Sequence, residues 1–203
     1  MPLALAILLG VAASGALAAP NRVLELSKDA ILAAHNAHRK AHGADPLAWD
    51  DGLRASALRY AQQCTWSHSA PEQRGGAGEN LYFANGYALT TGRRAVYAWY
   101  VEERDYDYAA PGRPKAGRDN AMIGHFTQIV WRGTKRVGCA AVQCSSMAYT
   151  AARNVQYLVC HYSPAGNVLV GSGTTPSAMR YSIQGVTYFK YAAPTSSSSR
   201  TVG

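Results

Sequence analysis

The first half of the chain carries apolar residues at the three- and four-residue spacing that is typical of helices with one buried face. The helices that this spacing predicts span residues 31–42, 50–64, 92–104 and 125–131. Ser27 and Thr91 precede the first and third of them and are suitable N-terminal caps. The first half of the chain is therefore expected to be mainly helical.

Two later segments have the composition of strands. Residues 136–144 read RVGCAAVQC and residues 154–162 read NVQYLVCHY, so both are rich in Val and Cys, with polar turn residues between them. We expect these strands to pair antiparallel. Residues 64–80 and 109–120 are expected to form loops, because turn residues interrupt the apolar pattern there. Helices followed by strands predict the α+β class.

The two ends differ in composition from the rest. Residues 1–18 contain no charged side chain and end in Ala16-Leu17-Ala18, which is typical of a signal-peptide cleavage site. A membrane anchor is the alternative, but the run is shorter than the roughly 20 residues of a span. We therefore expect a secretory signal peptide, a linker over residues 19–26, and a protein that is secreted and extracellular. Residues 171–203 are rich in Ser and Thr and are expected to form a flexible tail.

The formal net charge is +8 and the pI is about 9.5. A basic surface attracts anionic surfaces weakly at low salt. The basic residues are scattered and form neither a basic helix nor an RNA-binding motif, so no nucleic-acid partner is expected. No segment after residue 18 is apolar enough to predict a transmembrane span.

An even number of cysteines in an exported protein predicts disulfides. Cys139 and Cys144 lie five positions apart in one predicted strand, which places them on opposite faces and gives them different partners. Cys139 can reach Cys160 across the predicted hairpin, and Cys64 then remains for Cys144. The expected pairs are therefore Cys139–Cys160 and Cys64–Cys144.

One acidic residue lies where a helix should be buried. Glu102 falls on the apolar stripe of the third predicted helix. It is three residues after Trp99 and therefore next to it on that stripe. A buried carboxylate is costly unless a histidine or a cation partners it. Two imidazoles with carboxylate oxygens would suit zinc, but the spacing of His68, Glu79 and His125 does not by itself bring them to Glu102.

A second group of histidines offers an alternative metal site. His35, His38 and His42 recur at helical spacing in the first predicted helix. The structural interpretation is favoured, in which Asn36 and Arg39 bond neighbouring loops while His38 and His42 are solvated.

Four short stretches, in this order, resemble the motifs of the CAP superfamily, which includes cysteine-rich secretory proteins, venom antigens and pathogenesis-related class one proteins. They are HNAHR at 35–39, GENL at 78–81, GHFTQIVW at 124–131 and YLVCHYSPAGNV at 157–168. The sequence departs from the plant form of the last motif at His161, which replaces an Asn. The resemblance is nearest to plant and fungal secreted members. It implies a CAP domain over residues 27–170 with an α-β-α sandwich around a central antiparallel sheet.

The resemblance also implies a metal site. His68 stands in a Cys…His-Ser context, Glu79 belongs to GENL, Glu102 lies three residues after a tryptophan, and His125 belongs to GHFTQ. In similar proteins two such histidines hold Zn2+ or another divalent cation in a cleft, and the acids lie nearby. The same resemblance supports the disulfide pairing given above.

The function implied is that of a secreted protein that binds a small hydrophobic ligand, such as a sterol or a fatty acid, and acts in host–microbe defence or antagonism. The candidate lining is Leu81, Tyr82, Phe83, Trp99 and Tyr100. The alternative is a metal-dependent hydrolase or protease that uses the same cleft. HExxH and GxSxG motifs do not occur, so no catalytic residue is assigned.

Overall fold

The computed structural model describes residues 21–85 and 92–167. The predicted signal peptide and the predicted Ser/Thr-rich tail lie outside these residues, as does Thr91. The strands are β1 (Arg22–Leu24), β2 (Ala48–Trp49), β3 (Gly78–Asn85), β4 (Arg136–Ser146) and β5 (Arg153–Ser163). The helices are α1 (Lys28–Ala41), α2 (Asp51–Ala61), α3 (Arg93–Tyr100) and α4 (Gly124–Val130), with 3-10 segments η1 (Pro71–Arg74) and η2 (Val101–Asp105).

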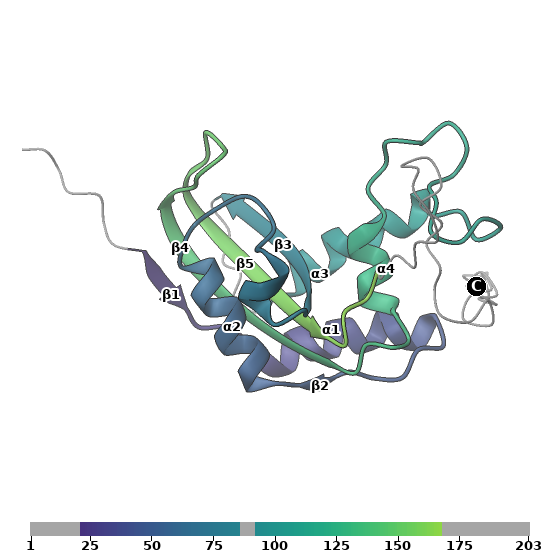
Figure 1. The fold of residues 1–203 in the computed structure, drawn as a ribbon, viewed down its shortest axis with the longest axis horizontal. Coiled ribbons are helices and arrows are strands. Elements are labelled where there is room, and N and C mark those ends of the chain that lie inside the picture. Colours follow the sequence, from purple (N-terminus) through teal and green to yellow (C-terminus); the bar gives the residue numbers. More distant parts are fainter. Residues whose placement is uncertain (1–20, 86–91, 168–203) are drawn as a thin grey trace, which may run out of the picture.

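The strands form one sheet in the order β1-β4-β5-β3, and β2 pairs with β4 (Figure 1). Every pairing is antiparallel except that of β2 with β4. The predicted hairpin of β4 and β5 is confirmed and lies at the centre of the sheet. β3 pairs only with β5 among the described strands, so its other side is a sheet edge.

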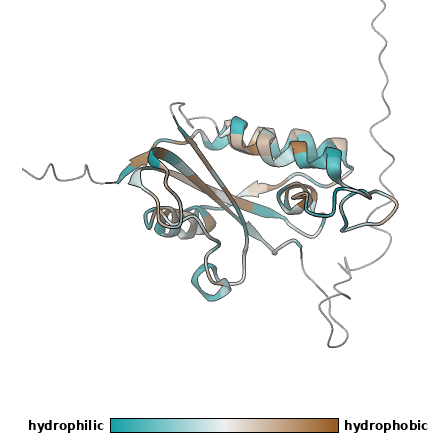
Figure 2. Ribbon diagram, turned by 90° about the horizontal axis from the view of Figure 1, so that it is seen from above, coloured by the Kyte–Doolittle hydropathy of each residue, from teal (hydrophilic) through white to brown (hydrophobic). Residues whose placement is uncertain are grey.

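Helices cover both faces of this sheet because strand side chains alternate between two apolar layers. On one face α1, α3 and α4 pack on Cys139, Leu158 and Cys160. On the other face α2 packs on Leu81 and on strand residues that alternate with the first set. Figure 2 shows the largely hydrophobic strands between the helices. The predicted α-β-α sandwich is therefore confirmed.

The helices begin where the sequence offers a cap. Ser27 Oγ accepts a hydrogen bond from Ala30 N at 3.3 Å, so the predicted cap of α1 is confirmed. Asp50 caps α2 in the same way through Leu53 N. α3 instead begins after Gly92, which has a φ of 63° and no side-chain cap. The third predicted helix is α-helical only to Tyr100 and continues as η2.

Three strands were not predicted. β1 lies in the segment assigned to a linker, β2 has two residues, and β3 begins inside the predicted loop 64–80. That loop also contains η1. These elements lack a long alternating pattern of their own, and the sheet supplies their hydrogen-bond partners.

The HNAHR stretch is structural, as predicted. Asn36 binds the backbone of Leu47 in both directions, at 3.1 Å and 2.7 Å. Arg39 is fully buried and donates to four backbone carbonyls, those of Asp45, Ile129, Trp131 and Thr134. α1 is thereby tied to the end of α4 and to the turn before β4.

Both predicted disulfides are present. Cys64 bonds to Cys144 and Cys139 bonds to Cys160. Cys139 and Cys160 are direct cross-strand partners on β4 and β5. Cys64–Cys144 joins the loop after α2 to β4. In the part of the chain that the structure describes, no helix is long and apolar enough to span a bilayer.

We expect the fold to lose stability in mild acid because His35 is buried as a neutral ring. Its Nδ1 donates to Ile31 O at 2.8 Å, and Nε2 lies 2.9 Å from the Tyr162 hydroxyl. Burial lowers the pKa of His35 from 6.5 to about 4; the hydrogen bond to Ile31 O opposes this shift, and the nearby charge of Arg39 adds to it. Between these two pH values the unfolded chain therefore binds more protons than the folded chain. The stability that neutral His35 contributes is complete above pH 6.5 and is lost as the pH falls toward 4.

The expected loss from His35 is about 3 kcal/mol at pH 4, to be measured by denaturant unfolding at a series of pH values. Burial also lowers the pKa of His38 and His42, which adds to the effect in the same direction. His35→Gln should make the dependence shallower by a similar amount. A wild-type free energy of unfolding that stays constant between pH 6.5 and 4 would contradict this.

Candidate metal centre

The first histidine and the first acid of the predicted site contact each other. His68 lies in the loop after α2, and its Nδ1 is 2.8 Å from Glu79 Oε1, on β3. The side chain of Glu79 is 1% exposed, whereas that of His68 is 59% exposed. The carboxylate is therefore an interior anchor, and the imidazole extends from it to the surface.

Glu79 is held by donors on both carboxylate oxygens. Oε1 accepts from His68 Nδ1 and from Ser69 N, and Oε2 accepts from Ser69 Oγ and His161 Nε2. Burial by itself would raise the pKa of Glu79, but hydrogen bonds from His161, His68 and Ser69 overcome it and hold that pKa well below its usual range. Glu79 is thus an ionised, fully engaged acceptor.

The second histidine and the second acid form another pair. His125 is the second residue of α4, and its Nδ1 lies 2.6 Å from Glu102 Oε1, in η2. Glu102 Oε2 accepts the backbone N–H groups of His125 and Phe126, so the carboxylate also caps α4. The His125 ring stacks on Trp99, with ring centroids 6.1 Å apart. Glu102 therefore has the histidine partner that its place on the apolar stripe required.

In both pairs the hydrogen bond determines which ring nitrogen carries the proton. An ionised carboxylate can only accept, so Nδ1 of His68 and of His125 donates. The neutral ring then has its lone pair on Nε2. Carboxylates orient metal-binding histidines in this way, since the bond fixes the tautomer and the ring direction. Each pair thus provides one nitrogen suited to a cation.

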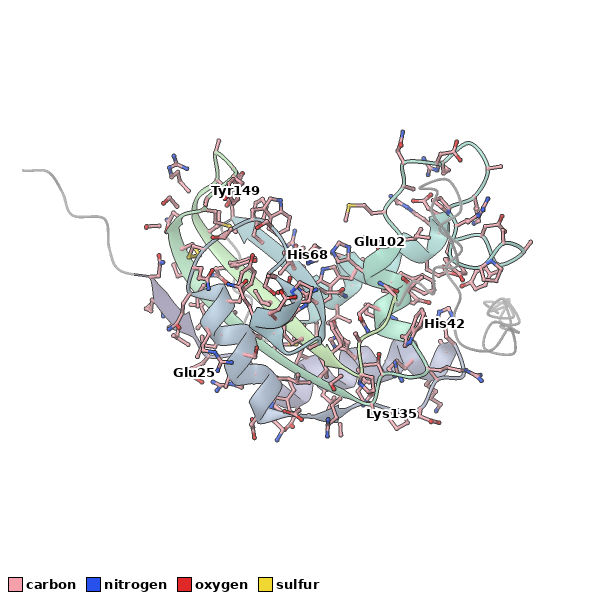
Figure 3. All side chains as sticks on the ribbon, viewed as in Figure 1. Glu25, His42, His68, Glu102, Lys135 and Tyr149 are labelled. Atoms are coloured by element: carbon pink, nitrogen blue, oxygen red, sulfur yellow. A yellow bond between two sulfur atoms is a disulfide. The ribbon has the colours of Figure 1, made fainter. Side chains whose placement is uncertain are left out.

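β3 links the two pairs through adjacent residues. Glu79 holds His68, and the next residue, Asn80, donates from Nδ2 to His125 O at 3.2 Å. Adjacent strand residues point to opposite faces, so the pairs approach β3 from its two sides. Figure 3 labels one residue of each pair, His68 beside the sheet and Glu102 beside α4. Glu79 therefore holds one pair from one side of the strand, and Asn80 holds the other pair from the opposite side.

The structure groups the four predicted residues as two pairs. Within residues 21–85 and 92–167, no three His, Cys, Asp or Glu side chains are arranged so that they could hold a metal together. Both glutamates instead accept from histidines and backbone N–H groups, and Glu79 also accepts from the Ser69 hydroxyl, which makes four hydrogen bonds at Glu79 and three at Glu102. The donor set available for a metal is therefore two imidazole nitrogens.

The histidines of the alternative cluster on α1 are engaged in hydrogen bonds and ring packing. Both ring nitrogens of His35 have partners. His38 stacks on Tyr100 with centroids 3.7 Å apart, and His42 Nε2 lies 3.1 Å from the Tyr100 hydroxyl. The prediction that His38 and His42 are solvated was wrong, since His38 is half-buried and His42 is buried. The cause is Tyr100 on α3, which covers this face of α1.

Three residues around the pairs were not predicted from the sequence. Ser69 supplies two of the bonds to Glu79, His161 supplies a third, and Asn80 holds the backbone at His125. Ser69 directly follows His68, and Asn80 directly follows Glu79, so adjacency was an available signal for both. His161 is far away in sequence and becomes a neighbour only through the pairing of β3 with β5.

The predicted hydrophobic lining belongs mostly to the core. Leu81 and Trp99 are buried on opposite faces of the sheet. Tyr82 and Tyr100 pack against the cluster of Trp99, and Phe83 packs against that of Leu81. These side chains stabilise the sandwich.

A family model described as CAP, cysteine-rich secretory protein family, matches residues 32–162. A pathogenesis-related protein of PR-1 type from Sambucus nigra is 39% identical over 142 residues, which are 66% of this chain and 74% of that protein. A probable pathogenesis-related protein from Arthroderma benhamiae is 36% identical over 140 residues, 66% of this chain and 43% of that protein. The crystal structure of NaASP2 with Zn2+ has a TM-score of 0.54 at 26% identity and covers 72% of this chain and 83% of that one. With the fold and both histidine–glutamate pairs in place, these matches show that the chain belongs to the CAP family, the cysteine-rich secretory proteins.

Proposed function

We propose that this protein is a secreted, pathogenesis-related-type CAP protein that binds a divalent cation, Zn2+ or one of similar chemistry, through Nε2 of His68 and Nε2 of His125. The observation that carries the proposal is the Nδ1–carboxylate bond of each histidine, at 2.8 Å and 2.6 Å. The relative NaASP2, whose structure is described as containing Zn2+, supports the choice of metal.

The donor set fits a metal that keeps open positions. Zinc is usually four-coordinate and accepts imidazole nitrogen, so two histidines leave places for water or for a bound molecule. Glu79 and Glu102 act as positioning residues, because their oxygens are already engaged by the histidines and by backbone N–H groups. When bound, the metal would supply a Lewis acid at the surface of the protein.

The secreted and defence-related parts of the proposal rest on the relatives and on the cysteines. The matched plant and fungal proteins are named as pathogenesis-related proteins. Both disulfides are buried, and structural disulfides are typical of proteins from oxidising compartments such as the extracellular space. A role in host–microbe defence or antagonism follows as the expected setting.

The geometry favours metal binding over the two other expected activities. A sterol or fatty acid would have to displace side chains such as Trp99, which is 2% exposed and donates from Nε1 to Leu81 O. A hydrolase would need a carboxylate able to take a proton from water, but Glu79 and Glu102 already accept four and three hydrogen bonds. Neither activity is required for a site that binds a cation.

Zinc titration by calorimetry, on protein stripped with a chelator, tests the proposal. We expect one zinc per chain, and we expect His68→Ala and His125→Ala each to weaken binding by more than about tenfold, because each removes one of two protein ligands. His38→Ala is the matched control, since His38 stacks on Tyr100 and is not one of the proposed ligands. Equal zinc affinity in the wild type and in both site variants would refute the proposal.

A further inference from the structure

One buried histidine has no place in the proposed donor set. His161 lies on β5 directly opposite Glu79 on β3, and opposite Gly138 on β4. Cross-strand partners project from the same face of a sheet, so His161 and Glu79 point to the side covered by α2. His161 is 1% exposed, which prevents it from reaching the surface where His68 lies.

His161 holds the oxygen of Glu79 that does not face His68. Its Nε2 donates to Glu79 Oε2 at 3.0 Å, while Glu79 Oε1 accepts from His68 Nδ1. Ser69 contributes one bond to each oxygen, and its hydroxyl is itself within 3.1 Å of Arg74. Fixing Oε2 from the interior limits rotation of the carboxylate, and this rotation determines whether Oε1 is directed at His68.

The other ring nitrogen of His161, Nδ1, makes this arrangement energetically costly. Nδ1 is buried and has no hydrogen-bond partner among the described residues. A Cβ atom at Gly138, the neighbour of His161, would clash with the backbone of Arg54 and Asp50, so α2 packs closely on the sheet here. A buried polar atom without a partner costs about 1–3 kcal/mol. An apolar residue would avoid that cost, but it would leave Glu79 Oε2 without its imidazole donor.

The geometry points to His161 as a positioning residue. It fixes the orientation of the Glu79 carboxylate, and Glu79 in turn orients His68 for metal binding. This inference rests on the proposed function and identifies an element that regulates the affinity of the same site. The order of contacts is His161 Nε2 to Glu79 Oε2, then Glu79 Oε1 to His68 Nδ1, which leaves Nε2 of the largely exposed His68 for a cation.

Three substitutions separate positioning from packing. His161→Leu keeps bulk but has no donor, whereas His161→Gln places an amide N–H close to the position of the imidazole Nε2. His161→Asn has the same amide on a shorter side chain that cannot reach Glu79 Oε2. The probes are zinc affinity by calorimetry and the tautomer of His68 in the metal-free protein, read from its ring nitrogen shifts by NMR.

We expect the leucine and asparagine variants to bind zinc about tenfold more weakly, with His68 partly shifted to the Nε2–H tautomer. The glutamine variant should retain the wild-type affinity and the Nδ1–H tautomer. If the leucine variant does not fold, the comparison of asparagine with glutamine decides. Unchanged zinc affinity and unchanged His68 tautomer in His161→Asn would overturn the inference. If the wild type binds no zinc, the proposed function fails, while the tautomer in metal-free protein still decides the role of His161.

Discussion

Replacing Arg39 with alanine is expected to lower the free energy of unfolding by about 4 kcal/mol, a large part of the stability of a typical domain. Arg39 is fully buried and donates to four carbonyls, of which those of Ile129 and Thr134 are themselves buried. A buried acceptor that loses its donor costs about 1–3 kcal/mol, and two are created here. Ile129 O also lies in the last turn of α4, where carbonyls lack partners within the helix.

Urea unfolding followed by circular dichroism measures this effect. Lys40→Ala is the control, because Lys40 is adjacent to Arg39 on α1 but exposed, and it should change stability by less than about 0.5 kcal/mol. If Arg39→Ala lost no more stability than Lys40→Ala, the hydrogen bonds of Arg39 would not be what stabilises the contact between α1 and α4.

Removing the Cys64–Cys144 disulfide by a double alanine substitution is expected to cost about 4.5 kcal/mol. The bond joins residues 80 positions apart, and a cross-link of that span removes more freedom from the unfolded chain than a short one. The Cys139–Cys160 bond spans 21 positions, and the same relation gives about 3.3 kcal/mol for its removal. The loss of Cys64–Cys144 should therefore have the larger effect.

Denaturant unfolding of the two double variants under identical conditions gives the comparison. The intact wild type without reductant is the reference, and wild type with reductant should lose more stability than either variant. A larger loss of stability for the Cys139 and Cys160 variant would mean that restriction of the unfolded chain does not determine which disulfide stabilises the fold more.

Much of the fold could be predicted because its longest elements have regular patterns. α1, α2 and the β4–β5 hairpin were predicted within a few residues, since each buries one face or both at a fixed spacing. β3 was missed because its first residues, Gly78-Glu79-Asn80, are of types that are depleted in strands. They are buried in the sheet only because β5 pairs with them. β2, with two residues, is too short to show a period.

The candidate site was also only partly predictable from the sequence. The pairing of Glu102 with a histidine could be anticipated, because a carboxylate on a buried stripe needs a partner. The pairing of His68 with Glu79 has no signal in spacing and came from the resemblance alone. His161 could not be identified, since its contact with Glu79 depends on the register of two strands, of which one was not predicted.

The proposed site requires that His68 and His125 bind one and the same metal ion through Nε2. The most direct measurement is NMR of protein with labelled nitrogen and bound cadmium-113, a zinc substitute whose nucleus couples to its ligands. A shared site predicts one cadmium signal, coupled to Nε2 of His68 and to Nε2 of His125, with Nδ1 of both rings still protonated toward Glu79 and Glu102. Coupling to only one of these histidines, coupling through Nδ1, or two separate cadmium signals would contradict it.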